Sequence, residues 1–217
     1  MKFIVKGQEP TTFRDWKAEA NENWTPCYDN LQAPQKPILH QSLLQEQGFI
    51  CCYCNNRIEV QDSHIEHLVP QSQNIQGSDV DYNNMLASCG RSGASVYQGH
   101  SERTCGEHKG ESTIPITPEQ HDCELKFSYG SNGSISSATP NDNDAQQTIR
   151  ILNLDCDKLN RNRKDAIDGI IFVDRQTGEL ISDAERIIIL QRILDQDIEG
   201  RFIANCITIK QVLEGLA

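Results

Sequence analysis

Two runs near the N-terminus of the 217-residue chain carry apolar residues at helical spacing. The first run starts beside Thr12, which is placed to cap a helix, and a proline-containing connector over residues 26–37 separates it from the second. The inward-facing positions are Phe13, Trp16 and Ala20 in the first run and Leu39, Leu43 and Leu44 in the second. Residues 1–50 are therefore predicted to form a helical segment.

The helical period disappears over residues 51–112, which are rich in cysteine and histidine. Within them, residues 74–82 and the Gly/Ser-rich stretch 90–104 are typical of loops. Residues 113–140 are predicted to form a loop and a hairpin, because Leu125–Tyr129 alternates apolar and polar positions ahead of an Asn132-Gly133 turn.

Helical periodicity returns over residues 141–217. Two capping-box patterns, Ser182 with Glu185 and Thr208 with Gln211, are placed to begin helices. The apolar faces are Leu159, Ala166, Ile167 and Ile170, then Ile187–Leu190, Ile193 and Leu194, and finally Val212, Leu213 and Leu216. We expect the last two faces to form core rather than a docking surface. The whole pattern predicts a predominantly helical α+β protein in which helical additions flank a compact central module.

Composition places the chain among globular proteins, with 37% hydrophobic and 24% charged residues. It has no apolar run of the ~20 residues that span a bilayer, and its first ten residues lack the features of a secretory signal, so we expect a cytoplasmic protein. The net charge of −11 is unusual for a protein that grips nucleic acid alone. It indicates a partner that holds the substrate, unless a local groove differs from the global charge.

Nine cysteines are a high number for a reducing compartment, where clustered cysteines usually bind metal. Four of them stand alone, and we expect most of these to be small buried residues: Cys27, Cys123, Cys156 and Cys206. The other five lie between residues 51 and 105. Cys51 and Cys54 form a CxxC pair, which lets two thiolates reach one zinc ion, and Cys89 and Cys105 can complete a tetrahedral site.

Two alternatives to this zinc site stay open. Cys51, Cys52 and Cys54 could be ordinary small residues on a strand. Otherwise Cys89 or Cys105 could be an unbound thiol, with His100 or His108 as the true ligand.

Between the cysteine pairs lies the sequence His64-Ile65-Glu66-His67-Leu68-Val69-Pro70. Hydrolysis of a phosphodiester needs a base, a divalent ion and hard oxygen ligands for that ion. His67 supplies an imidazole that titrates near neutrality, and we expect it to be accessible at the surface. Glu66 supplies an oxygen ligand suited to magnesium or manganese. Adjacent residues of a strand face opposite ways, so the two share one site only if the backbone twists.

The order of these motifs resembles the HNH endonucleases. It runs from CxYC through IEHLVP to Asn84-Met85-Leu86-Ala87-Ser88-Cys89 and then Thr104-Cys105-Gly106-Glu107-His108-Lys109-Gly110. The resemblance implies a zinc-stapled ββα-metal fold over residues 51–112, with His67 as general base and Glu66 as metal ligand. It also implies that Asn84 orients the base or binds the ion. The family usually has a ligand directly after the last cysteine, where this chain has Gly106, and His108 is the candidate that would replace it.

The resemblance extends to HNH proteins of anti-phage defence operons, which include the PtuB subunit of Septu systems and retron-associated effectors. It rests on Ser42–Gln47, Pro70–Ser72 and Thr148–Leu154 in addition to the core motifs. Proteins of this group act beside an ABC-type ATPase, PtuA, which would fit an acidic nuclease. We therefore expect a defence nuclease that cleaves DNA. The rival hypotheses are a catalytically silent zinc module, which Gly106 favours, and a nuclease that acts on RNA or tRNA.

Overall fold

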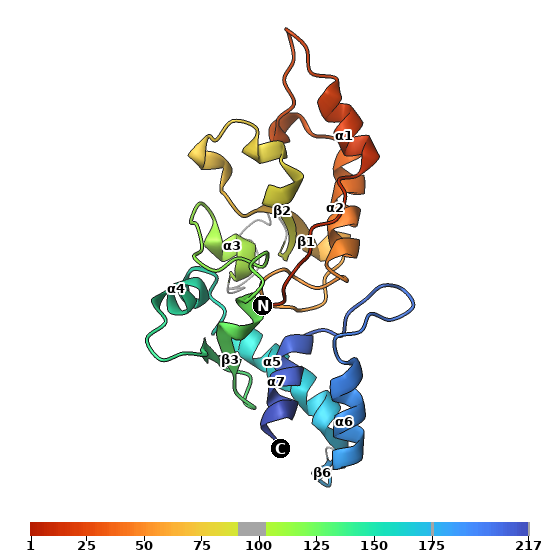
Figure 1. The fold of residues 1–217 in the computed structure, drawn as a ribbon, viewed down its shortest axis with the longest axis vertical. Coiled ribbons are helices and arrows are strands. Elements are labelled where there is room, and N and C mark those ends of the chain that lie inside the picture. Colours follow the sequence, from red (N-terminus) through yellow and green to blue (C-terminus); the bar gives the residue numbers. More distant parts are fainter. Residues whose placement is uncertain (91–102, 175, 217) are drawn as a thin grey trace.

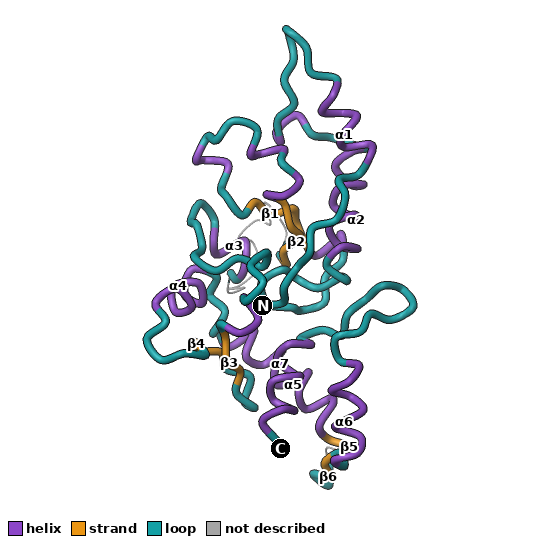
Figure 2. Tube along the Cα trace, in the orientation of Figure 1, coloured by secondary structure: helices purple, strands orange, loops and turns teal. Residues whose placement is uncertain are grey.

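The computed structural model describes residues 1–90, 103–174 and 176–216 (Figure 1). Helices alternate with three small antiparallel sheets of two strands each in these ranges (Figure 2). The helices are α1 Thr11–Ala18, α2 Gln35–Glu46, α3 Cys105–Lys109, α4 Asn143–Ile151, α5 Asp157–Ile171, α6 Asp183–Arg192 and α7 Cys206–Gly215. The strands are β1 Ser63–His67, β2 Met85–Cys89, β3 Phe127–Tyr129, β4 Ile135–Ser137, β5 Phe172–Asp174 and β6 Glu179–Leu180.

The N-terminal helices confirm the predicted apolar faces except at Ala20, which is exposed and lies beyond the end of α1. Phe13 and Trp16 of α1 are buried, and the leucines of α2 are fully enclosed. The cap of α1 was predicted wrongly, because the helix already begins at Thr11, behind Pro10, and its N-cap forms no side-chain hydrogen bond. A proline at this point removes no helical hydrogen bond, since the first N–H groups of a helix have no intrahelical partner.

Strands β1 and β2 form the central hairpin of the molecule. They pair antiparallel, with His64 opposite Ser88 and Glu66 opposite Leu86. Helix α2 packs against both strands and α3 packs against β2, so the hairpin lies between these two helices (Figure 1). A long connection, residues 68–84, joins the two strands and contains short 3-10 turns.

The helices pack around two hydrophobic cores. The larger core joins α1, α2, the hairpin and the first residues of the chain, and it extends to Leu159 of α5. The smaller core is formed by one face of α5 together with α7 and Ile193. Helices α5, α6 and α7 pack together at the end of the molecule that is opposite α1 (Figure 1).

The C-terminal half confirms part of the sequence prediction. The β3–β4 hairpin is present, and Ser182 and Glu185 form the predicted capping box of α6. The second capping box is wrong, because α7 starts at Cys206 and Thr208 is buried inside it. Helix α7 contributes core as expected, whereas α6 leaves Ile187 and Ile188 exposed. Among the described helices, none combines the length and the apolar character that crossing a bilayer requires.

Candidate functional site

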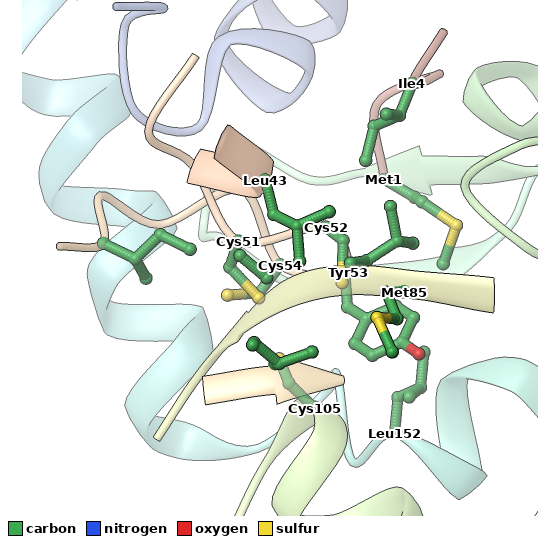
Figure 3. Packing of buried hydrophobic residues seen from close by; sticks show 14 of the residues in the cluster. Met1, Ile4, Leu43, Cys51, Cys52, Tyr53, Cys54, Met85, Cys105 and Leu152 are labelled. Carbon is green, nitrogen blue, oxygen red and sulfur yellow. The ribbon is translucent and has the colours of Figure 1, made fainter. Parts of the chain in front are cut away.

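Four cysteines from three separate segments converge at one end of the hairpin. Cys51 and Cys54 come from the turn before β1, Cys89 ends β2 and Cys105 begins α3. Their Sγ atoms all lie within 4.8 Å of one another. Figure 3 shows the sulfur atoms of Cys51 and Cys54 side by side. The structure thus brings the predicted ligand set together.

The spacing of the sulfur atoms fits a tetrahedral zinc site. Four thiolates bound at ~2.3 Å to one zinc ion would lie about 3.8 Å apart. The Sγ atoms of Cys54 and Cys89 are 3.8 Å apart, and none of the cysteines forms a disulfide. The cluster is therefore compatible with a structural metal such as zinc.

Local backbone geometry prepares the turn for this role. Asn55 adopts a left-handed conformation with φ of 62°, and its amide nitrogen donates to the carbonyl of Cys51. The backbone N–H of Cys89 points at Cys51 Sγ over 3.4 Å, as it would toward a thiolate. Burial opposes ionisation of Cys51, but hydrogen bonds from Cys105 and the other neighbouring thiols lower its pKa well below the usual value.

The four cysteines can complete a metal site without a histidine ligand. The described cluster is complete with four sulfurs, while His100 lies outside the described residues. His108 is exposed, and its Nδ1 lies 2.8 Å from the carbonyl oxygen of Ile151. Cys52, although adjacent to the ligands, is buried in the larger core.

Glu66 is a buried carboxylate on the middle of β1, with 6% of its surface exposed. Its Oε1 accepts from Tyr53 Oη at 3.2 Å and pairs with Lys109 Nζ at 2.9 Å. Its Oε2 lies 3.2 Å from His64 Nε2. Burial alone would raise the pKa of Glu66, but His64 and Lys109 outweigh it, so the pKa is lowered and the carboxylate is ionised.

Gly106 lies directly over this carboxylate. A Cβ atom at Gly106 would be 2.3 Å from Glu66 Oε2 and 2.7 Å from His64 Nε2. Real Cβ atoms do not approach other atoms so closely, so the position tolerates no side chain unless the hairpin moves. The space beside Gly106 is occupied by Glu66 and His64.

His67 faces away from Glu66, as alternation along a strand requires. Its Nε2 lies 3.0 Å from the carbonyl oxygen of Asp79, and its ring meets the ring of Tyr28 edge to face at 4.7 Å. The expected surface accessibility is wrong, because only 9% of His67 is exposed. Burial lowers the pKa of His67 against the opposing effects of Asp79 and Glu66, which keeps the imidazole neutral.

Asn84 holds the loop that contacts His67. Its Oδ1 accepts from the backbone N–H of Val69 at 2.7 Å, and its Nδ2 donates to the carbonyls of Val69 and Ser78. Ser78 precedes Asp79, whose carbonyl meets the imidazole of His67. Asn84 therefore fixes the backbone around His67, and both ends of its amide are used in doing so.

The structure does not bring His108 to the Glu66 carboxylate. Gly106 and Lys109 are three residues apart and share the face of α3 that contacts Glu66, while His108 lies on another face and contacts Ile151. Sequence reasoning missed the contributions of His64, Tyr53 and Lys109. For His64 a signal existed, because residues two apart on a strand share a face and His64 is two residues before Glu66.

These features define a four-cysteine cluster that could hold a metal, joined to a hairpin that carries a buried carboxylate and imidazoles. No protein-family model matches the chain. Over 148 residues it is 28% identical to the Vibrio cholerae (serotype O1 biovar El Tor) protein named "Retron Vc95 putative HNH endonuclease", covering 65% of this chain and 69% of that protein. Over 201 residues it is 24% identical to the Escherichia coli "Retron Ec83 putative HNH endonuclease", covering 76% and 78%. This similarity supports an HNH endonuclease family, and with it a nuclease.

Proposed function

We propose that the protein is a metal-dependent HNH endonuclease that cleaves DNA, with the hairpin and α3 forming a ββα-metal module. The observation that carries the proposal is the joint placement of Glu66, His67 and the four-cysteine cluster on one β1–β2–α3 unit. Zinc at the cluster would join the turn before β1, the end of β2 and the start of α3. It would thereby hold the short helix against the strands that carry the reacting groups.

Each residue of the hairpin has a role in this proposal. Glu66 binds a magnesium or manganese ion, which when bound stabilises the negative charge of the leaving oxygen. Neutral His67 takes the proton from the attacking water, and this step requires the end of β1 to twist so that the imidazole reaches the side of Glu66. The carbonyl of Asp79 orients the imidazole, and Asn84 keeps the loop of Asp79 in place. The buried, ionised carboxylate of Glu66 fits a hard divalent ion, and the absence of a side chain at Gly106 lets Oε2 lie beside His64 Nε2.

The net charge of −11 supports the proposal of a partner. A protein that must neutralise many phosphates on its own usually presents a basic surface. We propose that an ABC-type ATPase, as in the anti-phage systems that the sequence resembles, supplies substrate contacts and controls cleavage. The names of both relatives refer to retrons, which is consistent with such a defence role.

A second candidate function is a catalytically silent zinc module that serves as an interaction subunit. Gly106 favours it, because α3 offers no side chain at the position where related nucleases carry a ligand. Under this hypothesis Lys109 and His64 would simply neutralise Glu66.

One experiment separates these functions and the possible substrates. Zinc-loaded protein is incubated with supercoiled plasmid or total RNA, in Mg²⁺, Mn²⁺ or EDTA, with and without a candidate ABC-type ATPase partner. Metal-dependent nicking or linearisation of the plasmid supports the proposal. Cleavage of RNA alone corrects the substrate, and no cleavage of either in any combination supports the silent module.

A further inference from the structure

We infer that His64, and not a residue of α3, is the second protein ligand of the divalent ion bound by Glu66. The inference rests on the proposed function, because it concerns the same metal site. Three features of the structure support it: the orientation of the His64 ring, the close packing of Glu66 and His64 against Gly106, and the hydrogen bonds that hold Glu66.

The first feature is the hydrogen bond on the far side of the His64 ring. Nδ1 lies 2.9 Å from the carbonyl oxygen of Gly90, and a carbonyl only accepts, so Nδ1 carries the hydrogen. Nε2 lies 3.2 Å from Glu66 Oε2. In the metal-free protein a proton on Nε2 joins the two atoms as an ion pair, and a bound divalent ion would replace that proton. Histidines that bind metals commonly donate their other ring N–H to a backbone carbonyl in the same way.

The second feature is that a side chain at position 106 and the ring of His64 would occupy the same space. A side chain on Gly106 would collide with both Glu66 Oε2 and His64 Nε2, so a ligand from α3 and the present position of His64 exclude each other. The imidazole therefore occupies the side of the carboxylate from which an α3 ligand would otherwise approach.

The third feature is that the two carboxylate oxygens of Glu66 have different partners. Oε1 is held by Tyr53 and Lys109, which fixes the orientation of the carboxylate. Oε2 has His64 as its partner and faces Gly106. His64 also lines a cavity of about 360 Å³ together with Tyr28 and His40, so its side of the hairpin is not sealed from solvent. An ion on Oε2 and Nε2 would thus have an oriented carboxylate, and the cavity touches this pair at His64 and not at Glu66.

The test is Mn²⁺ binding to zinc-loaded protein, measured by titration and by electron spin-echo modulation from coordinated ¹⁴N. The variants are His64→Gln, which preserves bulk, His64→Ala, Glu66→Gln and the control His108→Ala. We expect both His64 variants to weaken Mn²⁺ at least about 10-fold and to remove the histidine ¹⁴N signal. His108→Ala should retain affinity within about twofold and keep the signal, and zinc content and melting temperature verify that each variant is folded.

The outcomes separate this inference from the proposed function. Weakened binding in Glu66→Gln with unchanged binding and ¹⁴N signal in both His64 variants overturns the inference and leaves the Glu66 site intact. Loss of the signal in His108→Ala instead assigns the ligand to α3 and also overturns it. Unchanged binding in Glu66→Gln removes the metal from the hairpin and refutes the proposed site itself.

Discussion

Replacing Cys54 by serine should destabilise the whole central module. The four cysteines join three segments, and α3 has only five residues, too short to persist without tertiary support. Structural zinc contributes ~10–16 kcal/mol of apparent binding free energy, so each of four thiolates accounts for about 2.5–4 kcal/mol. At roughly 2–4 °C per kcal/mol for a chain of this length, the melting temperature should fall by roughly 5–16 °C.

The matched control is Cys123→Ser. Cys123 is as buried as the cluster cysteines, but it lies outside the cluster and its Sγ contacts the carbonyl of Pro118. The assay combines zinc content by elemental analysis with differential scanning fluorimetry. Wild type and Cys123→Ser should hold one zinc per chain, while Cys54→Ser should hold less and melt lower. Equal zinc content and equal melting temperature in Cys54→Ser and wild type would refute the structural role of the cluster.

Two further predictions concern the buried ion pair and the binding of substrate. Lys109→Met should lower the free energy of unfolding by about 3–5 kcal/mol, because it leaves the Glu66 carboxylate buried without its ammonium partner. Adding Glu66→Gln should recover part of that loss in denaturant unfolding, and strictly additive effects would argue against the pair. The isolated protein should bind duplex DNA weakly, in the range of ~10⁻⁴–10⁻⁶ M typical of non-specific binding at physiological salt. Fluorescence anisotropy giving a Kd below about 10⁻⁷ M without the ATPase would contradict the need for a partner.

The parts of the structure that follow from local chemistry could be predicted from the sequence. The convergence of the CxxC pair and the two distant cysteines could be predicted, because a structural zinc site needs only four ligands and tolerates irregular spacing between them. The apolar face of α2 and the capping box of α6 also follow from short-range patterns. Helix starts were less secure: Thr208 has the residue type and spacing of a cap, yet burial against neighbouring helices places it inside α7.

The details of the hairpin depend on three-dimensional packing and could not be predicted. In the sequence Gly106 is a missing ligand, whereas in the structure its bare backbone gives Glu66 and His64 their space. Recognising this requires the register of β1 with β2 and the rotation of α3, neither of which is encoded by spacing. The burial of His67 likewise depends on Tyr28, which is 39 positions earlier in the chain.

The central claim is that this hairpin hydrolyses phosphodiester bonds, and the rate of plasmid cleavage by His67→Ala tests it most directly. Wild type and variant are compared at equal zinc content, in Mg²⁺ or Mn²⁺ and with the proposed ATPase partner present. We predict metal-dependent cleavage by wild type and a rate at least about 10²-fold lower in the variant, since a general base usually contributes ~10²–10⁴-fold. A folded, zinc-loaded His67→Ala protein that cleaves at more than about a hundredth of the wild-type rate would contradict the account.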